Sequence, residues 1–322
     1  MKIGVFTVLW ADQPLETVLD RVAEYGLQAV ELATSPYSNQ KHCPLAELLA
    51  DEGRRRALLR AVEERGLIIS GLSAHGNPLH PDPQIAQAAR EVHRQTVRLA
   101  EQLGVEVVNN FSGCPGGGPH DRTPNWITAP WPPEFARALA WQWEEVALPY
   151  WREEARFAAA HGVKIALEMH PNFLVYNPET LLRLREACGE NLGANFDPSH
   201  LFWQGIDPVA AIQVLGEAGA IYHFHAKDCR IHPWVARVHG VLDTKNYTDE
   251  IHRGWVFRTV GYGHEAAVWK DIVSMLRLVG YDHVLSIEHE DSLMSGDEGF
   301  RKAVAFLREV VIAEPRGEAY WA

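Results

Sequence analysis

The chain has 322 residues, 47% of them hydrophobic, which is enough for one large globular domain with a well-filled core. Its formal net charge is −12 and no run of Lys and Arg offsets it, so the composition argues against nucleic-acid binding. The first residues, MKIGVFTVLWADQ, contain too short an apolar stretch for a secretory signal or a membrane span. The four cysteines are scattered and form no CxxC pair, so we expect reduced thiols in a cytoplasmic protein.

Short β-branched runs alternate with longer amphipathic stretches along the whole chain, a pattern that predicts strands followed by helices. The expected strands are Lys2–Thr7, Ala29–Leu32, Leu67–Ser73, Val105–Phe111, Val163–Leu167, Leu192–Phe196, Ile221–Phe224 and Val284–Ile287. The expected helices are Leu15–Tyr25, Leu45–Arg65, Pro83–Leu103, Glu134–His161, Pro178–Cys188, Pro208–Ala218, one that begins near Ala266, and Asp297–Ile312. Such a series of strand–helix units favours a single (β/α)8 TIM barrel domain over residues 1–322, with an open doubly wound sheet as the alternative.

Glycine follows several of the expected helices, directly before the next strand. Glycine readily takes the left-handed conformation that ends a helix, so the repeated stop supports these boundaries. The positions are Gly26, Gly66, Gly104, Gly162 and Gly280. No Gly-x-Gly-x-x-Gly motif follows the first strand, so the doubly wound alternative lacks the dinucleotide-binding fingerprint.

Two connections are too long to be simple strand-to-helix loops. Ser112–Pro133 follows the fourth strand and contains Trp126 and Trp131, and Ala226–Glu265 follows the seventh strand and contains two more tryptophans. Both leave the carboxyl ends of strands, where barrel enzymes have their active sites. We therefore expect both segments to cover the mouth of the barrel or to form a subunit contact over it, which leaves a homo-oligomer open.

Four consecutive strands end in residue types that bind metals. Glu168 follows the fifth strand, Asp197 the sixth, His225 the seventh and Glu288 the eighth. Alone, Asp197 would indicate a helix cap and His225 a hydrogen-bonded core histidine. Their recurrence at one rim of a closed barrel instead predicts a site for one divalent metal, because buried carboxylates need a partner. One imidazole and three carboxylates suit Mn²⁺, with Mg²⁺, Co²⁺ or Zn²⁺ as alternatives.

These residues resemble the xylose isomerase-like TIM barrels, a superfamily that includes sugar isomerases and epimerases. The resemblance spans nearly the whole chain. It rests on Ala166-Leu167-Glu168, Asp197-Pro198-Ser199-His200, His223-Phe224-His225-Ala226-Lys227-Asp228, Gly261-Tyr262-Gly263 and Ser286-Ile287-Glu288-His289. It implies that Glu168, Asp197, His225 and Glu288 bind the metal. It further implies that Glu168 and Glu288 are the catalytic acid and base on opposite faces of the substrate, and that His200 contacts substrate oxygens.

Two features depart from the epimerase pattern. A second glutamate shortly after the fifth strand is missing from Pro171–Leu174, and a substrate-binding arginine after the seventh strand is matched only loosely by Arg230. Further residues near predicted strand ends are candidates to surround the substrate. They are His75, His170, Lys227, Asn109 and Trp10.

The resemblance implies a metal-dependent sugar isomerase or epimerase that removes a proton next to the carbonyl of a keto-sugar or polyol. A lyase or hydrolase that releases the aglycone of a 3-keto-glycoside on the same metal site is the alternative, and it would suit the tryptophan-bearing loops.

A DNA repair nuclease of the endonuclease IV type is a third alternative, with His75, His200 and His239 as further metal ligands. The acidic charge disfavours it, as does Asn109 where a histidine is expected. A barrel used only for binding is disfavoured because buried carboxylates without a metal are costly. The expected partner is a small carbohydrate, and neither nucleic acid nor a membrane.

Overall fold

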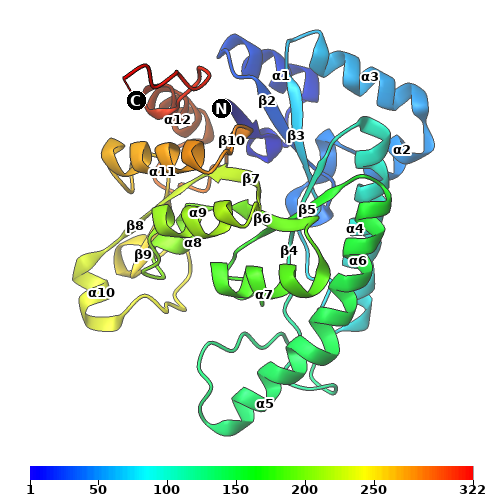
Figure 1. Cartoon of the computed structure of the whole chain (residues 1–322), viewed down its shortest axis with the longest axis vertical. Coiled ribbons are helices and arrows are strands. Elements are labelled where there is room, and N and C mark those ends of the chain that lie inside the picture. Colours follow the sequence, from blue (N-terminus) through cyan, green and yellow to red (C-terminus); the bar gives the residue numbers. More distant parts are fainter. Residues whose placement is uncertain (322) are drawn as a thin grey trace.

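The computed structural model describes residues 1–321 and shows a closed barrel of parallel strands with helices outside them (Figure 1). The barrel strands are β1 (Lys2–Phe6), β2 (Ala29–Ala33), β3 (Ile68–Ser73), β4 (Val107–Phe111), β5 (Lys164–Glu168), β6 (Leu192–Phe196), β7 (Ile221–Ala226) and β10 (Val284–Ile287). Their order is β1-β10-β7-β6-β5-β4-β3-β2, and β1 pairs with both β10 and β2. This closure confirms the predicted TIM barrel and rules out the open sheet.

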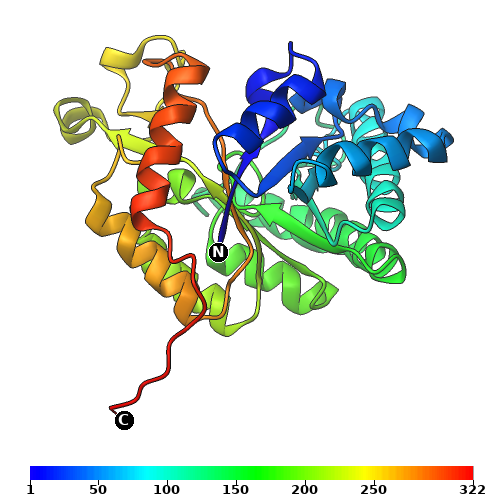
Figure 2. The same cartoon turned by 90° about the horizontal axis from the view of Figure 1, so that it is seen from above.

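The helices form an outer ring, which Figure 2 shows from above. They are α1 (Leu15–Glu24), α2 (Leu45–Ala50), α3 (Glu52–Glu63), α4 (Pro83–Leu103), α5 (Pro133–Trp141), α6 (Leu148–Ala160), α7 (Pro178–Cys188), α8 (Pro198–Phe202), α9 (Pro208–Glu217), α10 (Pro233–His239), α11 (Ala266–Leu278) and α12 (Gly296–Val310). Among the helices of residues 1–321, none combines the length and the hydropathy needed to cross a membrane. All four cysteines are free thiols.

Two expected helices differ in detail from the prediction. The segment Leu45–Arg65 is divided at Asp51, whose extended backbone ends α2 and whose carboxylate caps α3 by accepting from the Arg54 N–H at 3.2 Å. The segment Glu134–His161 contains a π-helical section, η4 (Gln142–Ala147), between α5 and α6. All five predicted helix-ending glycines have positive φ, between 61° and 87°.

The two long connections differ from each other in structure. The segment between β4 and α5 contains no helix or strand. The segment between β7 and α11 contains α10 and an antiparallel hairpin, in which β8 (Asp228–Ile231) pairs with β9 (Trp255–Arg258). The carboxylate of Asp228 anchors this hairpin, because it accepts from the backbone N–H groups of Gly261, Gly263 and His264. A side chain at Gly263 would meet the Cys229 carbonyl at 2.1 Å, so the Gly261-Tyr262-Gly263 motif serves the fold here.

The interior of the barrel holds a layer of polar side chains. Side chains from six strands hydrogen-bond to one another across the barrel axis and therefore face its interior. They are Glu31, Ser73, Asn109, Asn195, His223, His225 and Ser286, all fully buried. This layer lies directly beneath the carboxyl ends of the strands, where the site residues were predicted.

Candidate active site

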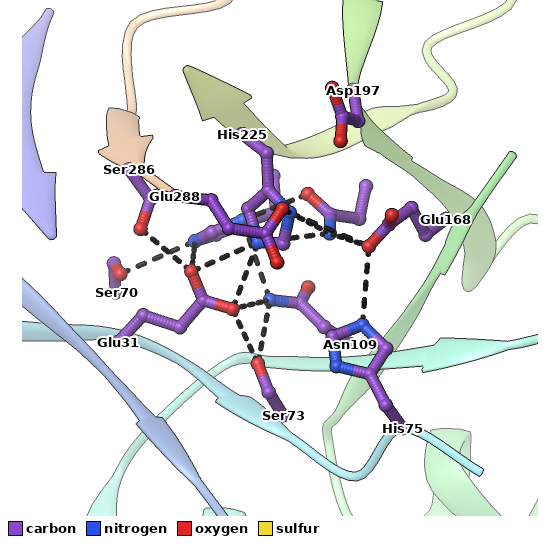
Figure 3. A network of polar contacts seen from close by, with 12 residues as sticks. Glu31, Ser70, Ser73, His75, Asn109, Glu168, Asp197, His225, Ser286 and Glu288 are labelled. Carbon is purple, nitrogen blue, oxygen red and sulfur yellow. Dashed lines mark hydrogen bonds and ion pairs between the residues drawn. The ribbon is translucent and has the colours of Figure 1, made fainter. Parts of the chain in front are cut away.

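The four predicted metal ligands lie together at the carboxyl ends of β5, β6, β7 and β10 (Figure 3). Glu168 is the last residue of β5, His225 lies in β7, and Asp197 and Glu288 directly follow β6 and β10. One ligand atom from each of them lies within 4.8 Å of those of the others. Strand β7 extends two residues beyond its predicted end, which carries His225 into register with Ser286 of β10.

The two carboxylate oxygens of Asp197 have different surroundings. Its Oδ1 accepts from the Ser199 N–H at 2.8 Å and thereby caps α8, as a lone acidic residue after a strand predicts. Its Oδ2 is buried and accepts no well-aligned hydrogen bond, although Lys227 Nζ lies 3.0 Å from it. A buried carboxylate oxygen in this state has a free lone pair that a metal could use.

His225 joins the predicted ligands to a carboxylate deeper in the barrel. Its Nδ1 lies 3.1 Å from Glu288 Oε2 and 3.4 Å from Glu168 Oε2. Its Nε2 lies 3.0 Å and 3.1 Å from the two carboxylate oxygens of Glu31. A histidine with one nitrogen toward a metal commonly donates the other N–H to a carboxylate, which determines the tautomer and the ring orientation.

Glu31 is the residue of this site that the sequence reasoning missed. Besides His225, its carboxylate accepts from Asn109 Nδ2 at 3.0 Å, from Ser286 Oγ at 2.7 Å and from Ser73 Oγ. Burial alone would raise the pKa of Glu31, but the nearby imidazoles of His225 and His223 and the hydrogen bonds hold it well below its usual range. The available signal was a charged residue in the middle of the apolar strand Ala29–Ala33.

The three carboxylates among the predicted ligands depend on nearby positive charges to stay ionised. Burial raises the pKa of Asp197 to about 6; the Lys227 ammonium opposes this rise, and the carboxylates of Glu168 and Glu288 add to it. Burial would also raise the pKa of Glu288, but Lys227 and His225 lower it to about 2. Burial likewise opposes ionisation of Glu168, yet contacts with histidines keep its pKa well below the usual value. A divalent cation among these carboxylates would supply charge that one ammonium and one imidazolium must otherwise provide.

Several residues predicted to surround the substrate also lie at the site. His200 Nε2 is 3.0 Å and His75 Nε2 is 3.3 Å from oxygens of Glu168. The ring of His170 packs against that of His200, with centroids 4.0 Å apart. Lys227 Nζ lies 2.6 Å from Glu288 and is fully buried. Among the residues described, Glu168, His170 and His200 form a further group with converging potential ligand atoms.

The structure does not bring Trp10 or Arg230 to the site. The Trp10 indole is buried, donates to Asp297 Oδ1 at 2.8 Å and packs on Phe300, so it joins helix α12 to the start of the barrel. Arg230 lies in the hairpin strand β8, and its guanidinium donates to the Gly263 carbonyl at 2.9 Å. Neither side chain lines a cavity at the mouth.

Two cavities open at the mouth of the barrel. The first, of 210 Å³, is lined by Glu168, His75, Lys227 and Glu288. The second, of 290 Å³, adjoins it and is lined by residues of both long connections, which confirms that these segments cover the mouth. A larger cavity of 580 Å³ lies at the amino ends of the strands and contains none of the predicted site residues. The chemistry of the site therefore belongs to the two cavities at the carboxyl ends.

Two of the three further histidines of the nuclease alternative, His75 and His200, lie beside Glu168, and His239 does not. His239 is exposed on α10 and belongs to none of the groups of residues in positions 1–321 that could hold a metal. Asn109, which stands where a further histidine was sought, hydrogen-bonds to Glu31. The acidic charge and this arrangement together disfavour a multi-metal nuclease.

Comparison with protein families identifies the fold group. The model of the xylose isomerase-like TIM barrel family matches residues 19–310. The chain belongs to this family. A relative from Bacillus subtilis, the uncharacterized protein YfiH, is 41% identical over 314 residues, which cover 97% of this chain and 99% of YfiH.

Several solved structures share the fold at lower identity. The probable 3-DHS dehydratase AsbF of Bacillus anthracis is 20% identical, with a TM-score of 0.66 and coverage of 96% and 99% of the two chains. A D-tagatose 3-epimerase-like protein is 22% identical, with a TM-score of 0.63 and coverage of 96% and 98%. The IOLI protein, whose crystal structure has a bound zinc atom, is 18% identical, with a TM-score of 0.64 and coverage of 97% and 98%.

Proposed function

We propose that this protein is a metal-dependent isomerase or epimerase of a keto-sugar or polyol. One divalent ion, Mn²⁺ in the first instance, would be held by Glu168, Asp197, His225 and Glu288. The observation that carries the proposal is the placement of Glu168 and Glu288. They come from β5 and β10, which β6 and β7 separate, and both line the cavity of 210 Å³. The membership in the xylose isomerase-like family and the structural likeness to an epimerase-like protein support it.

The bound metal would act as a Lewis acid that polarises the carbonyl and makes the neighbouring C–H more acidic. The low pKa of Glu168 keeps it ionised, so it can accept that proton. Return of the proton to the neighbouring carbon by the same carboxylate would give isomerisation. Donation of a second proton to the original carbon from the other face, by a Glu288 that has first taken a proton from solvent, would give epimerisation, and Glu168 would then release the abstracted proton to solvent. His75 and His200 hold the Glu168 carboxylate in position throughout, because each contacts one of its oxygens.

A second candidate reaction starts with the same proton transfer. In a keto-glycoside, removal of the proton α to the ketone can be followed by cleavage of the β C–O bond, which releases the aglycone as an alcohol and leaves an enone. The second cavity beside the site favours this reaction, since it offers room for an aglycone. The structural likeness to a probable dehydratase is consistent with an elimination on this fold.

Solvent exchange tests the proton transfer that both reactions share. Keto-sugars and 3-keto-glycosides are incubated with the protein and Mn²⁺ in D₂O and followed by NMR. We expect deuterium at the reacting carbon, or at the α-carbon of the ketone during an elimination. Complete retention of the substrate hydrogen over many turnovers, together with active Glu168→Gln and Glu288→Gln variants, would instead indicate a hydride shift.

A further inference from the structure

The second cavity at the mouth lies beside the proposed metal site, and its lining includes five aromatic side chains. We propose that it is a subsite for a second sugar ring, so that the substrate is a disaccharide-like glycoside and not a free monosaccharide. This assignment names the substrate class of the proposed function, and it rests on the proposed function because that function says which ring reacts. The binding test below does not depend on turnover.

The walls are aromatic, but three of the rings already carry a cation: Arg253 lies 4.2 Å and 5.0 Å from the ring centroids of Tyr247 and Trp255, and Lys227 lies 4.8 Å from that of Phe257. Trp126, over which no cation of the described residues lies, is therefore the ring offered to the C–H face of a sugar. Trp203 and Trp255 stack on each other, with ring centroids 4.7 Å apart and an interplanar angle of 6°. Tyr247 and Phe257 form a second stacked pair, 5.9 Å apart at 7°. All four rings line the cavity, together with Trp126 from the other long connection. The stacking contacts therefore hold the rings of each pair in a fixed orientation.

Two residues of the lining also carry donors that lack partners. The indole Nε1–H groups of Trp126 and Trp203 are buried and donate to no acceptor in the described part of the chain. A buried donor without an acceptor is costly, and a bound hydroxyl would satisfy it. Asn172 and Thr244 add further polar groups to the lining. Aromatic walls combined with free donors suit a ring that carries hydroxyls better than a purely apolar aglycone.

The second cavity is contiguous with the acid/base pair. His170 lines both cavities, and His200, which lines the second, lies 3.0 Å from Glu168 through its Nε2. Their volumes are 210 Å³ and 290 Å³, whereas ligand sites usually measure roughly 300–1,000 Å³. The two cavities together lie well within that range. A two-ring ligand would place one ring over Glu168 and Glu288 and the other between the aromatic walls.

The test compares one-ring and two-ring ligands by titration of the full chain with Mg²⁺ present, read by saturation-transfer NMR. Glucose is compared with cellobiose, maltose and trehalose, and phenyl glucoside represents an aromatic aglycone. Trp126→Ala removes the whole ring, and Trp126→Phe keeps a smaller aromatic wall but removes the N–H donor. The matched control is Trp131→Ala, because Trp131 belongs to the same connection but is 76% exposed and does not line the cavity. Thermal unfolding checks that each variant is folded.

We expect at least one disaccharide to bind about tenfold more tightly than glucose, the advantage expected from burying a second ring against aromatic walls. Trp126→Ala should remove that advantage, Trp126→Phe should remove part of it, and Trp131→Ala should keep it.

Equal affinity for glucose and all three disaccharides would overturn the subsite. If phenyl glucoside binds more strongly than every disaccharide, and Trp126→Phe does not change its binding, the assignment of the second cavity to a sugar ring is overturned. Turnover of free keto-sugars with no preference for two rings would leave the proposed function standing without the subsite. A preference for two-ring ligands with no turnover of any keto-sugar would support the subsite and contradict the proposed function.

Discussion

Replacing Glu31 by Gln tests whether the polar layer beneath the site prepares His225 for a metal. The change keeps the shape of the side chain but turns one acceptor oxygen into an NH₂ donor. Both oxygens are in use: Oε1 receives hydrogen bonds from Asn109, Ser73 and His225, and Oε2 from Ser286 and His225. In either orientation, the NH₂ group of the amide therefore faces at least one group that is itself a hydrogen-bond donor.

The expected loss follows from what the amide does to His225. If its NH₂ faces Nε2, the imidazole proton moves to Nδ1, the nitrogen that lies 3.1 Å from Glu288 and faces the proposed metal. If its oxygen faces Nε2, the NH₂ opposes Asn109 and Ser73 or Ser286. Loss of such a supporting contact typically costs about 10–100-fold in metal affinity or activity. That corresponds to roughly 1.4–2.7 kcal/mol, within the range of about 1–3 kcal/mol for one unsatisfied buried group.

The assay is a competition titration of Mn²⁺ against a chelator, performed on the wild type, Glu31→Gln and Glu64→Gln. Glu64 is the control because it is exposed at the end of α3, far from the barrel interior. We expect Glu31→Gln to bind metal 10–100-fold more weakly and Glu64→Gln to match the wild type. A folded Glu31→Gln protein that binds Mn²⁺ within about twofold of the wild type would refute the role of Glu31 as a positioning residue.

Three further outcomes follow from the same structure. Purified protein should contain about one divalent ion per chain by elemental analysis, and a chelator should abolish activity; crystal density that shows the four ligand side chains apart with no ion between them would contradict this. Glu168→Gln and Glu288→Gln should each lower the turnover rate by at least about 10²–10⁴-fold, because each loses a base and weakens the metal site; a loss below tenfold at either position would contradict its role. Burial lowers the pKa of His93 to about 4, below its ordinary value of 6.5, so the unfolded chain binds a proton first as the pH falls. The contribution of His93 to the free energy of unfolding should therefore decrease by about 3 kcal/mol between pH 6.5 and 4. Urea unfolding of His93→Gln should show a shallower pH dependence than that of the wild type, and equal slopes would contradict the assignment of this effect to His93.

The sequence by itself determined the fold and the positions of the four predicted ligands. Alternating periodicity and the glycines after the helices are local signals, and they mark each strand end within a few residues. In a parallel barrel the carboxyl ends of all strands meet at one rim. A ligand-type residue at a strand end, such as Glu168 or Glu288, can therefore be assigned to the same place without knowledge of any contact.

Only the tertiary structure decided which other side chains support that rim. The contact between Glu31 and His225 joins positions 194 residues apart, and that between Glu31 and Ser286 joins positions 255 apart. Trp10 lies close to a strand end yet packs on α12, while Trp126 reaches the mouth from a connection without regular structure. Periodicity reports which face of an element is apolar, but the partner on that face depends on how the barrel closes and how the loops fold over it. The polar layer and the second cavity both arise from such long-range contacts, so no local pattern could have predicted them.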